Sequence, residues 1–483
     1  MAKIKSYTSY LTEGSFTVKD VISLSFFNLL GKNTKGTSNK QYYMEIDEGS
    51  SFFQIYYCYG PVGGSQTIYY EKFDSYIDAK KEFDKVLKSK LKKGYVEVDV
   101  AQRVIGTESA KKIIKPVELK NLKLDDLPKS NLHKETQRLI NSIMGATNQF
   151  VITTLRCPLG QLTNKQIDEG RARLNSAKSI VSNKAHSDDH KLLELTNEFY
   201  SLIPHNLGCG ARGQMKELLL DSLDKIIQKE YDLDTLLDAK DLNINLTGTS
   251  IDDQYKSLDT EFSFIDHSDE RFKWLCNMIN DTRAHNHKYL GRITLLNAWG
   301  ITRKGEEDKF NVYLDKIGNE CGKQVYPDKM YKLVTTRPDG NPIEYQKANV
   351  IPLFHGTRTE NLTGILKKGL LIRPSGVVLC GAMYGNGIYH GLSSKACGYT
   401  SIKASIWAKG NANNGYLFIN DCALGNQLVA RGSYQYNSKN ILPNHSVHAK
   451  GGLSGVINDE FMLYNTNQNR MRYLLEFTCS GGH

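Results

Sequence analysis

Three short stretches near the end of the chain carry side chains that can do chemistry, and the first is centred on His355. His355 ends an apolar run, and Gly356 follows it at once. A glycine beside a polar anchor lets a ligand approach the backbone, whose N–H and C=O groups can then pair with a carboxamide. A single histidine after a strand is more often structural, so this stretch alone assigns no function.

The second stretch holds two tyrosines, Tyr389 and Tyr399, on either side of a Ser-Lys pair at 394 and 395. Stacked rings gain energy beyond the area they bury, so these tyrosines can sandwich a flat heteroaromatic ring. The simpler interpretation is two packed core aromatics. A G-x-G at 385–387 lacks the third glycine and the acidic residue of a dinucleotide-binding fingerprint, which argues against a Rossmann fold.

The third stretch begins at Glu460, which enters an alternating, strand-like run. Breaking a bond between a sugar carbon and its leaving group develops oxocarbenium character, which a neighbouring carboxylate stabilises. Such a group can also accept the proton of an incoming hydroxyl. A single glutamate in this position is otherwise usually a solvated strand residue.

The elements that position these residues belong to a chain too long for one ordinary core, and its 483 residues predict three domains. A content of 40% hydrophobic and 24% charged residues is typical of globular proteins. No apolar run approaches the roughly 18 residues that span a bilayer, and the first residues lack a signal-peptide stretch. We therefore expect an intracellular protein with no membrane contact.

Cysteine spacing and net charge narrow the class of partner. The nine cysteines are scattered and never spaced as C-x-x-C, which disfavours a disulfide framework or a zinc module, so we expect no metal. The net charge of +10 favours a polyanionic partner, because lysine and arginine neutralise phosphates. Charge alone is a weak signal, since many basic proteins never bind nucleic acid.

The pattern of apolar residues divides the chain into segments. In residues 1–105, strand-like runs are followed from Tyr76 by a lysine-rich helical pattern, which predicts a small antiparallel sheet with one covering helix. Residues 106–130 have scattered charge and two prolines and are typical of a linker. Residues 131–245 predict an all-helical bundle, and residues 250–483 an α+β domain with a twisted sheet. The fold class is thus multidomain α+β.

The first segment resembles the WGR domain over roughly residues 20–100. WGR domains bind nucleic acid and are named for a Trp-Gly-Arg triplet after a strand. Here the triplet is Tyr59-Gly60-Pro61, so the aromatic ring is kept and the arginine is replaced. The resemblance implies a nucleic-acid contact at Tyr59, whereas Pro61 has no side-chain donor for a phosphate.

The rest of the chain resembles poly(ADP-ribose) polymerases. The fragments PLGQLTNKQI (158–167) and LTNEFYSLIPHNLG (195–208) are similar to the regulatory helical domain of the DNA-dependent members. Residues 255–480 resemble the transferase domain through LFHGTRTENLTGILKKGL, YGNGIY, SSKACGY, CALGN, HSVHAKG and NDEFMLYNTNQNRMRYLLEF, in that order. The resemblance identifies a WGR-like domain, a helical regulatory domain and an ADP-ribosyltransferase domain.

The resemblance implies an enzyme that consumes NAD⁺ and transfers ADP-ribose or its polymer to acceptor proteins, including itself, in the response to DNA damage. It implies no cofactor beyond NAD⁺, DNA breaks as a partner, a monomer when free and a nuclear location, otherwise a cytoplasmic one. Two alternatives stay open: a mono-ADP-ribosyltransferase or NAD⁺ hydrolase, and a catalytically weak DNA-binding scaffold.

The resemblance also assigns residues. The family's His-Tyr-Glu triad matches His355, Tyr389 and Glu460, a pattern that accompanies polymer elongation in the family. Glu460 is then the main catalytic residue, and Gly356 pairs its backbone with the carboxamide. The residues implied to contact NAD⁺ are His355, Gly356, Thr357, Gly364, Arg373, Tyr389, Ser394, Lys395, Ala396 and Tyr399.

Two departures from the family pattern affect this set. Ala396 stands where the family usually has a serine that bonds the carboxamide, and one such hydrogen bond is worth about 0.5 to 1.5 kcal/mol, or roughly tenfold in affinity. The segment before it is one residue shorter than usual, so Ser393 or Ser394 can replace that hydroxyl. Leu371 stands where an arginine is usual, which makes Arg373 the substitute.

Overall fold

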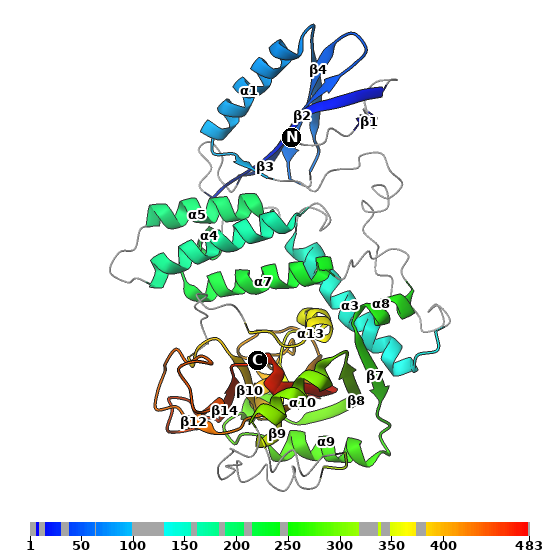
Figure 1. The fold of residues 1–483 in the computed structure, drawn as a ribbon, viewed down its shortest axis with the longest axis vertical. Helices are drawn as coiled ribbons and strands as arrows, with labels where there is room; N and C mark the ends of the chain where they lie inside the picture. The colour runs from blue at the N-terminus through cyan, green and yellow to red at the C-terminus, as the bar shows by residue number, and fades with distance from the viewer. Residues whose placement is uncertain are drawn as a thin grey trace. The chain divides into compact units, whose positions relative to one another are not determined.

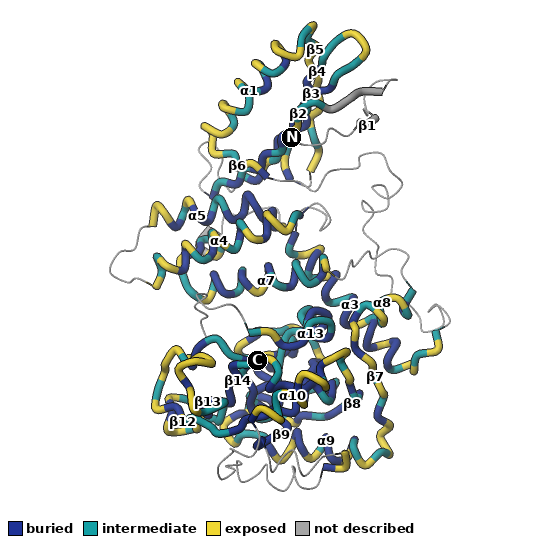
Figure 2. Tube along the Cα trace, viewed as in Figure 1, coloured by how far each residue is buried: buried dark blue, intermediate teal, exposed yellow. Residues whose placement is uncertain are grey.

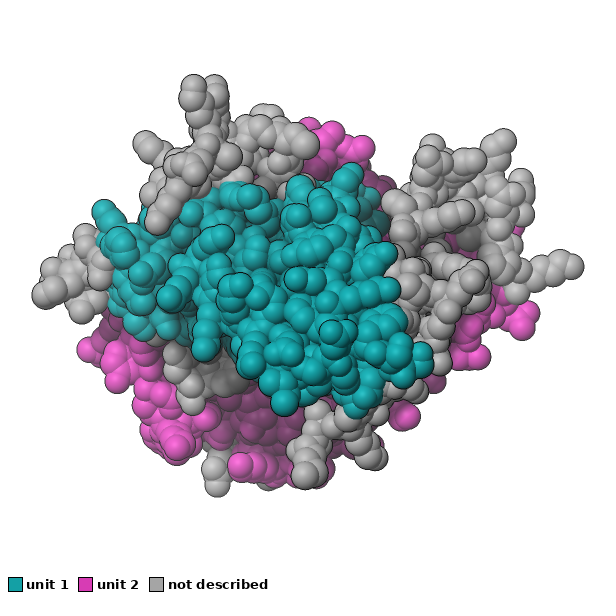
Figure 3. Space-filling view, turned by 90° about the horizontal axis from the view of Figure 1, so that it is seen from above, with its two compact units in different colours: residues 1–120, 149–247 teal, residues 121–148, 248–483 magenta. Residues whose placement is uncertain are grey.

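The computed structural model describes residues 6–8, 15–29, 38–62, 64–98, 130–155, 162–182, 189–206, 215–241, 250–317, 337–339, 348–372 and 383–481. Arg373, expected to contact NAD⁺, lies outside these ranges. The chain forms two compact units, residues 1–120 with 149–247 and residues 121–148 with 248–483 (Figure 3). Each unit is described by itself.

The first unit contains a six-stranded antiparallel sheet, as expected for the first segment. Its strand order is β1-β2-β3-β4-β5, and β6 pairs with β2. Helix α1 begins after Ser75, whose side chain accepts the Asp78 N–H, and it buries Ala79 and Phe83 against the sheet (Figure 1). The bounds are β1 Ser6–Thr8, β2 Ser15–Asn28, β3 Ser38–Glu48, β4 Phe53–Pro61, β5 Thr67–Phe73, α1 Tyr76–Lys92 and β6 Val96–Glu97.

Helices make up the rest of the first unit. They bury apolar faces that meet in one core around Leu174, Phe199 and Leu233. The end of β2 joins the same core, where Phe27 N–H donates to Ser201 Oγ at 2.9 Å. The helices are α4 Asn164–Ser182, α5 Asp189–Leu202, α6 Met215–Leu218, α7 Leu223–Asp241 and the last residues of α3 Lys134–Thr154.

The second unit is built on a nine-stranded mixed sheet with the order β12-β13-β14-β10-β9-β11-β15-β8-β7, which confirms the α+β expectation. The strands are β7 Thr260–Phe264, β8 Ile293–Arg303, β9 Val350–Gly356, β10 Ile388–Gly391, β11 Asn414–Ala423, β12 Gln427–Val429, β13 Ser446–Ala449, β14 Glu460–Leu463 and β15 Asn469–Cys479. Figure 2 shows that the central strands are mostly buried.

Short helices accompany this sheet, and the first part of α3 belongs to the same unit. They are α8 Ile251–Ser257, α9 Glu270–Asp281, α10 Glu306–Ile317, α13 Leu362–Lys368 and α14 Ser393–Cys397, with single 3-10 turns η3 Lys288–Leu290, η4 Thr359–Asn361 and η5 Thr466–Gln468. In the part of the chain that the structure describes, no helix has the length and apolarity needed to cross a bilayer.

The sheet order explains how distant stretches meet. Strand β10 lies between β14 and β9, and Gly391 faces Glu460 on one side and Phe354 on the other. Directly opposed residues of antiparallel strands lie about 5 Å apart. The residues singled out on the three stretches therefore converge at adjacent strands.

Candidate active site

His355 and Tyr389 are joined through the backbone. His355 Nδ1 lies 2.9 Å from the carbonyl oxygen of Tyr389. A carbonyl only accepts, so Nδ1 carries the proton and Nε2 is left as an acceptor. Burial lowers the pKa of His355, which keeps the ring neutral at physiological pH. A neutral imidazole with an accepting Nε2 suits a ribose hydroxyl.

The Tyr389 hydroxyl is fixed at the tip of a glycine turn. It donates to Gly385 O at 2.9 Å and accepts the Tyr384 N–H at 3.0 Å. Gly385 has φ +84°, and a Cβ there would lie 2.0 Å from Tyr436 O, so the turn requires glycine. Burial raises the pKa of Tyr389, so its hydroxyl stays protonated and the side chain is uncharged.

Glu460 and Lys395 form the charged part of the site. Lys395 Nζ lies 2.6 Å from Glu460 Oε1, and the two side chains are only 15% and 13% exposed. Lys395 comes from α14 and Glu460 begins β14. A partly buried pair is screened less by water than a surface pair, so the ammonium holds the carboxylate in place.

Gly356 lies directly against α14. A Cβ at this position would be 1.8 Å from the carbonyl oxygen of Ala396. The end of β9 therefore approaches the helix backbone more closely than any other residue type allows. The other residues expected nearby, Thr357 and Gly364, lie on the η4 and α13 side, where Asn361 Nδ2 donates to Thr357 Oγ1 at 3.2 Å and Gly364 is buried.

The two serines before Lys395 face the protein interior. Ser393 Oγ donates to Ile279 O at 2.6 Å. Ser394 Oγ accepts the Ala284 N–H at 2.9 Å and lies 2.9 Å from His287 Nδ1. Both hydroxyls have protein partners, so the structure gives neither of them the role of the serine missing at 396.

Tyr399, expected to contact NAD⁺, and Tyr59, expected to contact nucleic acid, each lie in an aromatic cluster. Tyr399 is 42% exposed and stacks on Trp407, with ring centroids 4.7 Å apart and planes at 17°. Tyr59, in the first unit, stacks on Tyr42 at 5.3 Å, and Lys90 Nζ lies 5.9 Å from its ring. Tyr59 is thus part of the aromatic packing of the sheet.

Sequence reasoning missed His287, Asn458 and Trp407. His287 Nε2 lies 3.0 Å from Asn458 Nδ2, and its other nitrogen contacts Ser394. His287 therefore links the segments that carry Lys395 and Glu460. These contacts join residues 107 and 171 positions apart, and no local pattern marks them.

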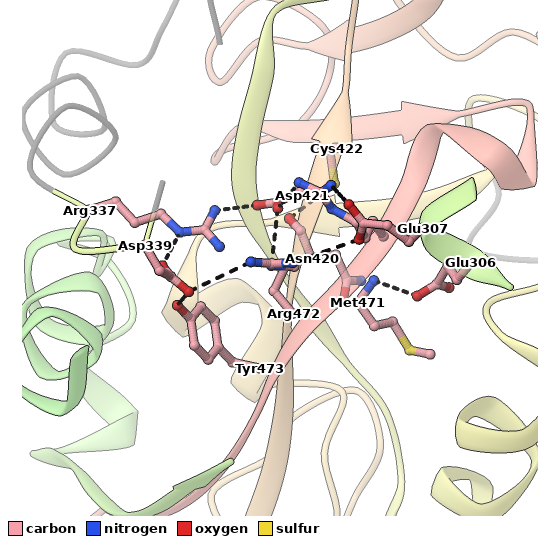
Figure 4. Close-up of polar contacts among 11 residues, drawn as sticks. Glu306, Glu307, Arg337, Asp339, Asn420, Asp421, Cys422, Met471, Arg472 and Tyr473 are labelled. Atoms are coloured by element: carbon pink, nitrogen blue, oxygen red, sulfur yellow. Dashed lines mark hydrogen bonds and ion pairs between the residues drawn. The ribbon is translucent and has the colours of Figure 1, made fainter. Parts of the chain in front are cut away.

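A second polar network connects side chains of β11 and β15 (Figure 4). The buried Asp421 carboxylate accepts Arg337 Nη1 at 2.5 Å and Arg470 Nη2 at 2.8 Å, while Arg472 Nε lies 3.5 Å away. Burial alone would raise the pKa of Asp421, but the arginines hold it below its usual value. The network joins neighbouring strands.

Within the described ranges, no group of three His, Cys, Asp or Glu side chains is placed to hold a metal ion.

Three family models match successive parts of the chain. The WGR domain matches residues 28–102, the poly(ADP-ribose) polymerase regulatory domain residues 130–262, and the poly(ADP-ribose) polymerase catalytic domain residues 269–479. These matches follow the same order as the sheet, the helices and the mixed sheet of the structure.

Curated relatives agree with this order. The chain is 27% identical to poly [ADP-ribose] polymerase 1 of Xenopus laevis over 75% of this chain and 36% of the relative. It is 26% identical to poly [ADP-ribose] polymerase 2 of Homo sapiens, over 87% and 70%. It is 25% identical to protein mono-ADP-ribosyltransferase PARP3 of Homo sapiens, over 92% and 86%. The alignment thus spans about a third of the length of the Xenopus relative. The chain belongs to the poly(ADP-ribose) polymerase family.

Proposed function

We propose that this protein is an NAD⁺ ADP-ribosyltransferase whose catalytic residues are Glu460, His355 and Tyr389. The observation that carries the proposal is the short Lys395–Glu460 contact, with Glu460 on β14 and the neutral His355 on β9, the two strands that flank β10. NAD⁺ is the consumed substrate, and no further cofactor or metal takes part.

The proposed reaction cleaves NAD⁺ and transfers its ADP-ribose to an acceptor hydroxyl. The carbon–nitrogen bond between nicotinamide and ribose breaks, and the leaving nicotinamide takes the bonding electron pair. Glu460 stabilises the positive charge that develops on the ribose and accepts the proton of the attacking acceptor hydroxyl. His355 accepts a hydrogen bond from an adenosine ribose hydroxyl through Nε2, and Gly356 pairs its backbone with the carboxamide. The tyrosines at 389 and 399 line the nicotinamide ring.

The remaining contacts are proposed for Thr357, Gly364, Arg373, Ser394 and Ala396. Of these, Ser394 acts through its backbone or by supporting Lys395, because its hydroxyl is bonded to protein atoms. Ala396 leaves the carboxamide one hydrogen bond short, which lowers NAD⁺ affinity by roughly tenfold. An Ala396→Ser variant should bind nicotinamide-like inhibitors more tightly.

We infer that the product is a polymer, because glutamate stands at 460 together with histidine at 355. A relative named as a mono-ADP-ribosyltransferase supports the competing product, a single transferred unit. Incubation with labelled NAD⁺ followed by a chain-resolving gel separates the two. A ladder of products supports the polymerase, and a uniform single-unit product excludes it.

The decisive test of the enzyme itself compares the parent chain with Glu460→Gln, which keeps the shape and removes the charge. Label should enter acceptor protein, including the enzyme, only with the parent. Equal labelling by both, or by neither, would exclude Glu460 catalysis. If neither enzyme labels the acceptor, the result favours the alternative of a catalytically weak scaffold.

DNA dependence is a separate part of the proposal. We place a WGR-like domain at 1–105, a linker at 106–130, a regulatory domain at 131–245 and the transferase domain at 250–483. The lysines of α1, together with Tyr59, support DNA binding in the nucleus, although Pro61 contributes no phosphate donor. NAD⁺ turnover should rise on addition of nicked DNA. Equal rates with and without it would exclude activation by DNA.

A further inference from the structure

Trp407 touches two of the residues expected to contact NAD⁺, Tyr399 and Lys395. Its indole stacks on Tyr399 at 4.7 Å, and Lys395 Nζ lies 4.4 Å from its ring centroid. The same ammonium contacts Glu460 at 2.6 Å. A cation over an indole face is attracted by the ring electrons. The indole is therefore a neighbour of the charged pair.

The indole is held in a defined position by its surroundings. A Cβ on Gly398 would lie 2.2 Å from two atoms of the ring, so the indole lies directly against the glycine backbone. The backbone N–H of Trp407 donates to Gly398 O at 3.1 Å. The His287 ring lies 6.0 Å away at 74°. These contacts fix the ring plane beside Tyr399.

This placement leaves aromatic surface open to a ligand. Trp407 is 39% exposed, whereas the chain's other two tryptophans, Trp274 and Trp299, are 4% and 1% exposed. Two parallel rings with uncovered area beside a buried charged pair are suited to a flat aromatic ligand.

We propose that Trp407 is a ring-contacting residue that, with Tyr399, forms part of the subsite for a flat aromatic carboxamide. The inference rests on the proposed function, because NAD⁺ supplies that ring. Ala396 provides no hydroxyl for the carboxamide, and the added aromatic contact offsets part of this loss. A stacked pair is worth about 0.5 to 1.5 kcal/mol, which corresponds to roughly threefold to tenfold in affinity.

Free nicotinamide is the probe for the first experiment, because its binding needs no turnover. Titration of the full chain should change the tryptophan emission. Trp407→Phe should abolish that change, because the two remaining tryptophans are buried. An emission change that persists in Trp407→Phe would place the ligand away from Trp407.

Calorimetry supplies the second readout. In calorimetry, Trp407→Ala should raise the Kd of nicotinamide by about threefold to tenfold. In initial-rate measurements the same variant should raise the KM of NAD⁺ by a similar factor, with kcat within about twofold of the parent. The values for Trp407→Phe should stay near those of the parent. Tyr434→Ala is the matched control, because Tyr434 is 56% exposed and contacts the ring of Tyr436 rather than Lys395. Circular dichroism checks that each variant is folded.

The outcomes separate this inference from the proposed function. Unchanged Kd and KM in folded Trp407→Ala would overturn it, and so would a fall in kcat alone, which assigns Trp407 only to the support of Lys395. Nicotinamide binding that depends on Trp407, in a parent chain without ADP-ribose transfer, would uphold the inference and overturn the proposed activity.

Discussion

The Lys395 ammonium reaches Glu460 from the short helix α14, and this helix packs directly against the end of β9, where Ala396 O occupies the space that a Cβ on Gly356 would need. The 2.6 Å contact between Lys395 and Glu460 thus depends on close approach of α14 to the strand end. Substitutions at Lys395 and at Gly356 therefore test the charged pair and the close approach of α14 to β9 one at a time.

Lys395→Met should lower kcat by about tenfold to a hundredfold, because the Glu460 carboxylate loses its restraint and a small misplacement of a catalytic group is costly. Initial rates with saturating NAD⁺ measure the effect. Lys439→Met, at an exposed position, is the control. A Lys395→Met enzyme with the parent kcat would contradict the positioning role.

Gly356→Ala should abolish activity and lower the unfolding temperature, since the new methyl carbon would meet Ala396 O. Gly432→Ala is a matched control, because nothing lies within 4 Å of its Cβ position. Thermal unfolding and NAD⁺ turnover are measured for both. If Gly356→Ala retains parent activity, the close approach of β9 and α14 is not required.

His287→Ala should reduce kcat by about tenfold, because His287 links the Ser394 and Asn458 segments, which carry Lys395 and Glu460. Asn458→Ala should have a similar effect, and the double variant should be little worse than either single one. Additive losses in the double-mutant cycle would show that the two residues act independently.

Asp421→Asn should destabilise the second unit by about 3 kcal/mol or more, because it leaves buried Arg337 and Arg470 without their shared negative charge. Glu307, whose side chain is 46% exposed, gives the control Glu307→Gln with a much smaller effect. Denaturation followed by tryptophan emission reports on this unit, which contains all three tryptophans. Equal effects of the two substitutions would contradict the importance of burial.

The stability of the second unit should fall as pH drops below about 6.5. Burial lowers the pKa of His287 and His355, and lowers that of His390 to about 3. In this range the unfolded chain binds more protons than the folded one, so acid favours unfolding. Glu306, whose pKa burial raises, opposes the trend.

Unfolding midpoints at pH 7.5 and 5.5 test this expectation. His390→Gln should reduce the difference between the two midpoints, because one of the buried neutral histidines is removed. A variant with the same pH dependence as the parent would show that His390 does not contribute.

The sequence by itself determined the family and the fold class. Irregular Pro/Gly motifs such as 158–167 and the order of His355, Tyr389 and Glu460 are local features, and the family models and the mixed α+β architecture confirmed what they indicated. The residue roles remain predictions, but the structure brings this triad to three adjacent strands.

Only the tertiary structure decided which way individual side chains point. It turned Ser393 and Ser394 inward, brought His287 to Asn458, and laid Trp407 on Tyr399. The serine and histidine contacts join segments more than 100 residues apart, so they depend on strand register and on how closely α14 approaches β9. Helical and strand periodicity carry no information about such contacts, because periodicity fixes a side chain's face and not its distant partner.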